Sequence, residues 1–274
     1  MKIEDLQDCI YKKEENTGIC TLTFNRPERR NALSFISLLE IETVLTHMEE
    51  DKTARVLIIT GSKESNAFTS GGYYSAKMLT SIPPEIKQEI DLMDMAQKRL
   101  CIKLFDFSKP IIAAINGLAI GAGITLPLIG ADLIYMAEDA WLGFYFVKRA
   151  VVPEFANDFI LPFYLGFQKA KEILYFGDQI SAQDALKLGL VNKVLPPERL
   201  IPYAREQALK LIPPRGASMS IKLMKKTMHN YFKDIVSKTL DLENEGYQKL
   251  IKTHDFREST KSLMEKRDPI FKGK

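Results

Sequence analysis

The segment from Lys109 to Asp132 constrains the fold of this chain more than any other part of it. It opens with a short apolar run, Ile111 to Ile115, which is rich in β-branched residues and lies between Pro110 and Asn116-Gly117. Such a run is typical of a buried strand. Glycines follow at positions 117, 121 and 123, and the apolar stretch after them is too short to cross a membrane. The segment therefore predicts a strand, a tight glycine turn and a buried helix.

The glycine turn also predicts a site for a negatively charged group. Because glycine has no Cβ, backbone N–H groups at the start of the helix can approach a ligand closely, and the helix dipole favours negative charge there. A second glycine loop, Ser70-Gly71-Gly72, follows an apolar strand predicted at Arg55 to Gly61. If the sheet places both loops side by side, two N–H groups point at one oxygen, as in an oxyanion hole. The alternative is that the glycines only permit tight turns.

Predicted strands and helices alternate through the first half of the chain, which indicates an α/β protein. The predicted strands cover 10–11, 19–24, 55–61, 111–115, 133–137, 140–143 and 190–195. One helix is expected from the N-cap Ser34 to about Asp51, and a long one from Pro83-Pro84 to about Phe107. Later helices are expected at 154–165, 168–176, 181–188, 199–212, 216–231, 235–252 and 255–266. We therefore expect a core at residues 1–198 and a helical C-terminal lobe at 199–274.

The composition is that of an ordinary globular protein and argues against several classes. There are 38 Lys and Arg residues against 35 Asp and Glu residues, so the formal charge of +3 gives no reason to expect nucleic acid as a partner. No apolar run approaches the length of about 18 residues that a membrane span needs, and the N-terminus lacks the apolar core of a signal peptide. The cysteines at 9, 20 and 101 form no C-x-x-C pair, so we expect a reducing compartment, the cytoplasm.

The charges are less even between Leu209 and Lys238. Seven Lys or Arg residues lie there beside a single acid, Asp234. A solvated helix face is one interpretation of this stretch, and a docking surface for a phosphorylated ligand is the other.

The motifs of several common chemistries are absent from the sequence. There is no G-x-x-x-x-G-K-[ST], H-E-x-x-H or G-x-S-x-G pattern, and the histidines at 47, 229 and 254 lack metal-ligand spacing. The glycines at 117, 121 and 123 do not form G-x-G-x-x-G, which argues against a nicotinamide cofactor. We expect neither a metal nor a cofactor.

Four sets of residues together resemble the enoyl-CoA hydratase/isomerase (crotonase) superfamily. In chain order they are Asn25-Arg26-Pro27 with Asn31-Ala32-Leu33, Ala67-Phe68 to Gly72, Lys109-Pro110 through Asn116-Gly117 to Gly123, and Glu265-Lys266-Arg267 with Phe271. Their order and spacing match the family over nearly the whole chain. The resemblance implies a crotonase-like spiral of ββα turns, a helical C-terminal trimerisation lobe and a homotrimer or hexamer. It also implies acyl-CoA thioester substrates, so that coenzyme A enters as part of the substrate.

The resemblance implies a set of site residues as well. By position, the N–H groups of Gly72 and Ala122 would hold the thioester oxygen. The family usually has Ala-Asp where this chain has Gly72-Tyr73, and glycine where it has Ala122, but a backbone donor survives both changes. Arg30, Ala32 and Lys266 match positions that contact coenzyme A in the family, and Lys266 matches a lysine that reaches its 3′-phosphate. Ser70, Tyr73 and Tyr74 are further candidates for contacts with the substrate, and the two tyrosines could instead be core aromatics.

The same comparison indicates which acid would act as the base. Hydratases of the superfamily need two glutamates, and their positions here hold Thr125 and Phe146, neither of which can act as a general base. Pro153-Glu154 resembles the loop of peroxisomal-type 3,2-enoyl-CoA isomerases, in which this glutamate moves a proton from C2 to C4. Its apolar surroundings predict a raised pKa for Glu154. Glu154 could instead be a first-turn helix acid, and Asp158 is then the reserve base.

An isomerase that moves a double bond from C3 to C2 of an enoyl-CoA is the function expected from these residues. The same pocket could also run another enolate reaction, such as decarboxylation, thioester hydrolysis or hydration. Tyr73 and the two missing hydratase acids are equally compatible with a non-catalytic acyl-CoA-binding or scaffold protein.

Overall fold

The computed structural model describes residues 1–72, 82 and 84–274. The predicted binding residues Tyr73 and Tyr74 lie outside this part of the chain.

The fold is α/β and contains two sheets. The larger sheet has the order β1-β2-β3-β5-β7-β10, in which β1 is antiparallel to β2 and the other neighbours are parallel. Its strands are Cys9–Lys13, Ile19–Phe24, Val56–Gly61, Ile111–Ile115, Leu133–Ala137 and Lys193–Leu195. The smaller sheet has the order β4-β6-β8-β9, with strands Ala67–Thr69, Leu118–Ile120, Trp141–Gly143 and Gln179–Ser181.

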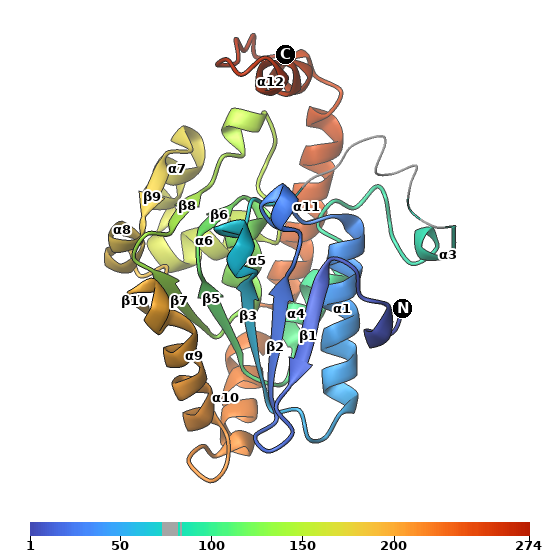
Figure 1. The fold of residues 1–274 in the computed structure, drawn as a ribbon. Coiled ribbons are helices and arrows are strands. Elements are labelled where there is room, and N and C mark those ends of the chain that lie inside the picture. The colour runs from blue at the N-terminus through green and yellow to red at the C-terminus, as the bar shows by residue number, and fades with distance from the viewer. Residues whose placement is uncertain (73–81, 83) are drawn as a thin grey trace.

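Helices cover the larger sheet and form the C-terminal part of the chain. The first group is α1 (Phe35–Glu50), α3 (Pro84–Lys87), α4 (Lys98–Asp106) and α5 (Ala122–Gly130). The second is α6 (Asn157–Leu165), α7 (Phe167–Phe176), α8 (Ala182–Lys187) and α9 (Pro197–Leu211). The last is α10 (Ser218–Asn230), α11 (Lys233–Leu250) and α12 (His254–Met264). Figure 1 shows α12 at the top of the molecule, at the end toward which the parallel strands point.

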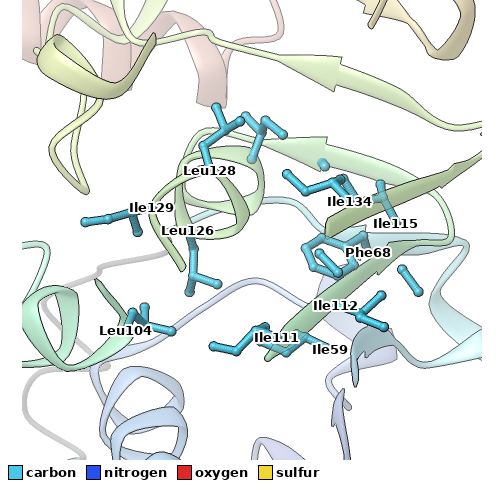
Figure 2. Packing of buried hydrophobic residues seen from close by; sticks show 14 of the residues in the cluster. Ile59, Phe68, Leu104, Ile111, Ile112, Ile115, Leu126, Leu128, Ile129 and Ile134 are labelled. Carbon is cyan, nitrogen blue, oxygen red and sulfur yellow. The ribbon is translucent and has the colours of Figure 1, made fainter. Parts of the chain in front are cut away.

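The main core lies between the sheet and the helices that pack on it. Figure 2 shows Phe68 beside the strand residues Ile112 and Ile115, with Leu126 of α5 and Leu104 of α4 approaching the same layer. All five side chains are almost completely buried. Burial of a leucine or phenylalanine of this kind stabilises the fold by about 1.5–3 kcal/mol.

Most of the predicted helices and strands are confirmed. Helix α1 is an example in which a capping residue marks the start of the helix in the sequence. Ser34 is its N-cap, and the Ser34 hydroxyl accepts a hydrogen bond of 3.0 Å from the Ser37 N–H. The side chain thus satisfies one of the N–H groups that have no partner within the helix. The strands β4, β6 and β9 were not predicted, whereas β8 and β10, which also have three residues each, fall within the strands predicted at 140–143 and 190–195.

The prediction of one long helix from Pro84 to Phe107 is wrong. In the structure α3 ends at Lys87 and α4 begins only at Lys98. Gln97 has a left-handed backbone with φ of 50°, and its side-chain amide donates to the Asp91 carbonyl at 2.6 Å. The Asp91 carboxylate in turn accepts from the Met93 N–H at 2.9 Å. Such local side-chain bonds compete with helical backbone bonds, which the apolar spacing alone does not reveal.

The helix predicted at 154–165 begins later than expected, at Asn157. Phe155 and Ala156 have left-handed φ values of 62° and 57°, which a right-handed helix cannot include. Glu154 therefore lies on a loop before α6, and the alternative that it is a first-turn helix acid does not hold.

The boundary at residue 198 between core and lobe stays a prediction. The helix that follows it, α9, packs on the larger sheet through Leu200, Ala204 and Ala208, all of which are fully buried. None of the described helices has both the length and the apolar character needed to span a membrane.

Candidate active site

A pocket of about 820 Å³ lies between the segments that follow the parallel strands β4, β6 and β8 and the helix α12. This volume is within the usual range of small-molecule sites. Its walls come from seven parts of the chain, with lining residues at 28, 29 and 32 and within 70–72, 94–96, 120–121, 145–154, 240–247 and 256–264. The side chains are mainly apolar, with a few charged groups among them.

The two glycine loops meet at one wall of this pocket. Gly71 has φ of 89°, and a Cβ at this residue would lie only 2.3 Å from the Ile120 carbonyl oxygen, so the two backbones touch directly. The Gly71 carbonyl accepts from the Leu33 N–H at 2.8 Å, which holds the loop in place. Gly72 lines the pocket, and none of the described residues accepts a hydrogen bond from its N–H.

Ala122 is the first residue of α5, where a backbone N–H has no partner within the helix. The N–H groups of Ile124 and Thr125 both donate to the Gly121 carbonyl, at 2.9 Å and 3.0 Å. The Ala122 amide faces the Glu154 carboxyl instead and acts to lower its pKa. Gly72 and Glu154 line the pocket, whereas Ala122 is buried and outside the lining, with its amide beside Glu154.

Burial dominates the electrostatics of Glu154. Desolvation raises the pKa of this carboxyl to about 7, and the opposing effect of the Ala122 amide is smaller. Val151, Val152 and Pro153 line the pocket on one side of Glu154, and the fully buried Phe155 follows it. A carboxyl with a pKa near 7 can both take and give a proton at neutral pH.

The other predicted positions fall into two groups. Ala32 and Ser70 line the pocket, whereas Arg30 and Lys266 are exposed and lie outside its lining. Asp158, the reserve base, is also exposed and outside the lining.

The two hydratase positions hold no acid at the pocket wall. Phe146 lines the pocket, close to Gly121, and Thr125 is fully buried beneath the start of α5. The Thr125 hydroxyl donates to the Gly121 carbonyl at 3.3 Å, so it completes the helix rather than facing a ligand.

The basic stretch after Leu209 is mostly a solvent-exposed surface. Of its seven basic residues only Lys225 is buried, and it pairs with Asp132 at 2.8 Å and donates to the Lys109 carbonyl at 3.2 Å. None of the seven lines the pocket. Within the described residues no group of three His, Cys, Asp or Glu side chains could hold a metal ion.

Sequence reasoning missed the contribution of α11 to the pocket. Glu243, Asn244 and Tyr247 line it, and Glu243 is only 5% exposed. Burial, together with the nearby charges of Asp158 and Glu154, raises the pKa of Glu243 well above its ordinary value. A signal was present in the sequence, because Glu243 follows the buried Val236 and Leu240 at helical spacing, and an acid on an apolar stripe is unusual.

Comparisons with known proteins show the family of this chain. A family model described as enoyl-CoA hydratase/isomerase matches residues 14–274. A crotonyl-CoA hydratase of Syntrophomonas wolfei is 30% identical over 98% of this chain and 99% of the relative. A 1,2-epoxyphenylacetyl-CoA isomerase of Escherichia coli is also 30% identical, over 94% of this chain and 96% of the relative.

A comparison with solved structures indicates the same family. The crystal structure of an enoyl-CoA hydratase/isomerase from Pseudoalteromonas atlantica superposes with a TM-score of 0.83 and 25% identity, and the match covers 97% of this chain and all of that one. The chain therefore belongs to the enoyl-CoA hydratase/isomerase family and has the crotonase fold.

Proposed function

We propose that this protein is an acyl-CoA isomerase that moves a double bond from C3 to C2 of an enoyl-CoA. One observation carries the proposal: Glu154 is the acid beside the Ala122 amide, and both hydratase positions, Thr125 and Phe146, lack an acid. A shift of the double bond requires one base that takes and returns a proton, whereas hydration also requires a water to be held and split.

The proposed chemistry uses the amides of the two glycine-containing segments and the Glu154 carboxyl. The N–H groups of Gly72 and Ala122 donate to the thioester oxygen, and Glu154 removes a proton from C2. The electron pair of the broken C–H bond moves into the carbonyl and gives a dienolate, whose negative oxygen the two amides stabilise. Glu154 then returns its proton to C4, and the double bond is left between C2 and C3. No cofactor is required.

The remaining predicted residues are assigned to coenzyme A in this proposal. Ala32 and Ser70 line the pocket beside Gly72 and are placed to contact the thioester end of the ligand. Arg30 and Lys266 are exposed, which suits contacts to the phosphate groups outside the pocket. Tyr73 and Tyr74 follow Gly72 directly in the sequence and stay a prediction.

Hydration is the second candidate, because relatives such as the Syntrophomonas wolfei protein are named hydratases. It would need a second acid, and Glu243 is a buried carboxyl at the pocket wall. Both Glu243 oxygens already accept backbone hydrogen bonds, at 2.8 Å and 3.0 Å, which weakens the case for a role in holding water. Decarboxylation, thioester hydrolysis and non-catalytic binding have no specific observation in their favour.

We further propose that the chain forms a homotrimer, or a hexamer built from two trimers. Helix α10 and the turn after it expose large apolar side chains, namely Met219, Leu223, Met224, Met228 and Tyr231. An exposed apolar patch of this kind typically marks a protein interface. Sedimentation equilibrium should give three or six times the 31.1 kDa chain mass, and a monomeric mass would contradict the proposal.

Glu154→Gln should remove the base while leaving the pocket nearly unchanged in shape. We expect kcat for conversion of a 3-enoyl-CoA to the 2-enoyl-CoA to fall by about 10²–10⁴-fold, with calorimetric binding of the ester almost unaffected. Asp158→Asn is the matched control and should retain wild-type turnover. Unchanged kcat in Glu154→Gln would remove Glu154 from the mechanism.

Ala122→Pro tests the oxyanion hole directly, because it deletes one N–H donor. Ala122 is the first residue of α5, a position where proline fits a helix well. We expect kcat to fall by about 10²–10³-fold while the protein stays folded, as judged by circular dichroism and thermal unfolding. A folded variant with normal turnover would show that the Ala122 amide is not a donor to the reacting oxygen.

The raised pKa of Glu154 predicts a pH-dependent stability. The native pKa of about 7 exceeds the ordinary value of 4.5, so the native state binds more protons than the unfolded state between these limits. The free energy of unfolding should therefore fall as the pH rises from 4.5 to 7. We expect the free energy of unfolding, measured with urea, to fall between pH 5 and pH 8 in wild type. In Glu154→Gln this fall should be smaller by about 1–3 kcal/mol. Equal losses in both proteins would mean that Glu154 titrates normally.

A further inference from the structure

We propose that Glu243 is a positioning residue, which, together with Gly246 on the same face of α11, sets the location of the Glu154 carboxyl. The proposal rests on the function proposed for Glu154 and adds the part of the C-terminal chain that makes that function possible. Helix α11 contacts the chain on both sides of Glu154.

Glu243 binds the chain just after Glu154. One carboxylate oxygen accepts from the Ala156 N–H at 2.8 Å and the other accepts from the Asp158 N–H at 3.0 Å. These N–H groups lie at the start of α6, where backbone donors have no partner within the helix. A carboxylate at a helix N-terminus is also favoured by the helix dipole. Glu243 therefore acts as a cap that is supplied by another helix.

The segment that Glu243 holds is strained. Phe155 and Ala156 both have left-handed backbones, with φ values of 62° and 57°, although neither is a glycine. Side chains with a Cβ rarely adopt this conformation, and it persists only where surrounding contacts enforce it. Phe155 is fully buried, so its side chain anchors the strained pair from one side while Glu243 anchors the Ala156 N–H from the other.

Gly246 supports the chain just before Glu154. A Cβ on Gly246 would lie 3.3 Å from both Cγ atoms of Val152, so the helix backbone packs closely against this side chain. Residues 243 and 246 are three apart and share one face of α11. The helix thus contacts the loop two residues before Glu154 and two residues after it. Movement of α11 or loss of either contact would displace the carboxyl.

Direct chemistry by Glu243 is the weaker interpretation. Both of its oxygens are already bound to backbone N–H groups, and its side chain is 5% exposed. A group that touches the substrate would need a free oxygen at the pocket surface. The observed contacts instead fix a loop whose other end carries the base.

The test compares Glu243→Ala and Glu243→Gln with the control Glu245→Gln, which changes an exposed acid on the same helix. A misplacement of catalytic groups by about 1 Å can lower the reaction rate by about 10²-fold. We therefore expect kcat of Glu243→Ala to fall by about 10²-fold, with KM changed by less than about threefold. Glu243→Gln keeps one acceptor oxygen and should lose less. Glu245→Gln should match wild type.

Gly246→Ala separates positioning from stability. Alanine is the better helix former by about 1 kcal/mol, whereas its Cβ would lie 3.3 Å from Val152 and displace it, so thermal unfolding should occur close to the wild-type temperature. The added Cβ presses on Val152, and we expect kcat to fall severalfold with KM unchanged. Wild-type kcat in both Glu243→Ala and Gly246→Ala would overturn the proposal, as would losses in kcat that are matched by equal rises in KM.

Hydrogen–deuterium exchange distinguishes failure of this proposal from failure of the isomerase function. In Glu243→Ala the amides of Ala156 and Asp158 should exchange faster by about tenfold than in wild type, whatever reaction the protein catalyses. If wild type isomerises no enoyl-CoA, the proposed function fails. In that case the rate of deuterium incorporation at C2 of butanoyl-CoA in D₂O replaces kcat as the measure of proton transfer by Glu154. Unchanged amide exchange in Glu243→Ala would refute the role of Glu243.

Discussion

Direct backbone contact between the two glycine-containing segments is the constraint on which the site depends. A Cβ on Gly71 would lie 2.3 Å from the Ile120 carbonyl, one on Gly117 would lie 2.6 Å from the Asn66 carbonyl, and one on Gly123 would lie 2.5 Å from the Thr69 carbonyl. No side chain fits at these three points. Because residues 66–71 and 117–123 approach so closely, Gly72 at the pocket wall and the buried Ala122, whose amide faces Glu154, lie on adjoining segments.

The pocket combines this rigid wall with an acid whose protonation depends on its surroundings. Apolar neighbours raise the pKa of Glu154 to about 7, and the Ala122 amide partly opposes that shift. In an apolar environment a hydrogen-bond donor acts on charge more strongly than it does in water. The same burial therefore serves both parts of the proposed chemistry. It keeps the pKa of the base near neutral pH, and it strengthens the hydrogen bonds that the two amides would donate to the enolate oxygen.

Short-range patterns predicted most of the fold. The Ser34 cap gave the start of α1, and apolar runs gave β2, β3, β5 and β7 within about a residue. Two helix predictions failed, each where a feature of the local backbone overrides apolar spacing. Gln97 and Asp91 interrupt the helix that was predicted to run to Phe107, and the left-handed pair Phe155-Ala156 delays α6.

The sequence by itself indicated the family, through four motifs spread over nearly the whole chain, and it also indicated the two glycine loops and the acid after Pro153. Each of these motifs is short, and its residues lie next to one another. Only the tertiary structure decided what surrounds Glu154. Glu243 is almost ninety positions away in the chain, yet it holds the two amides that follow this loop, and α12 encloses the pocket from above. Contacts between distant segments depend on how helices pack on the sheet, and no local pattern records that packing.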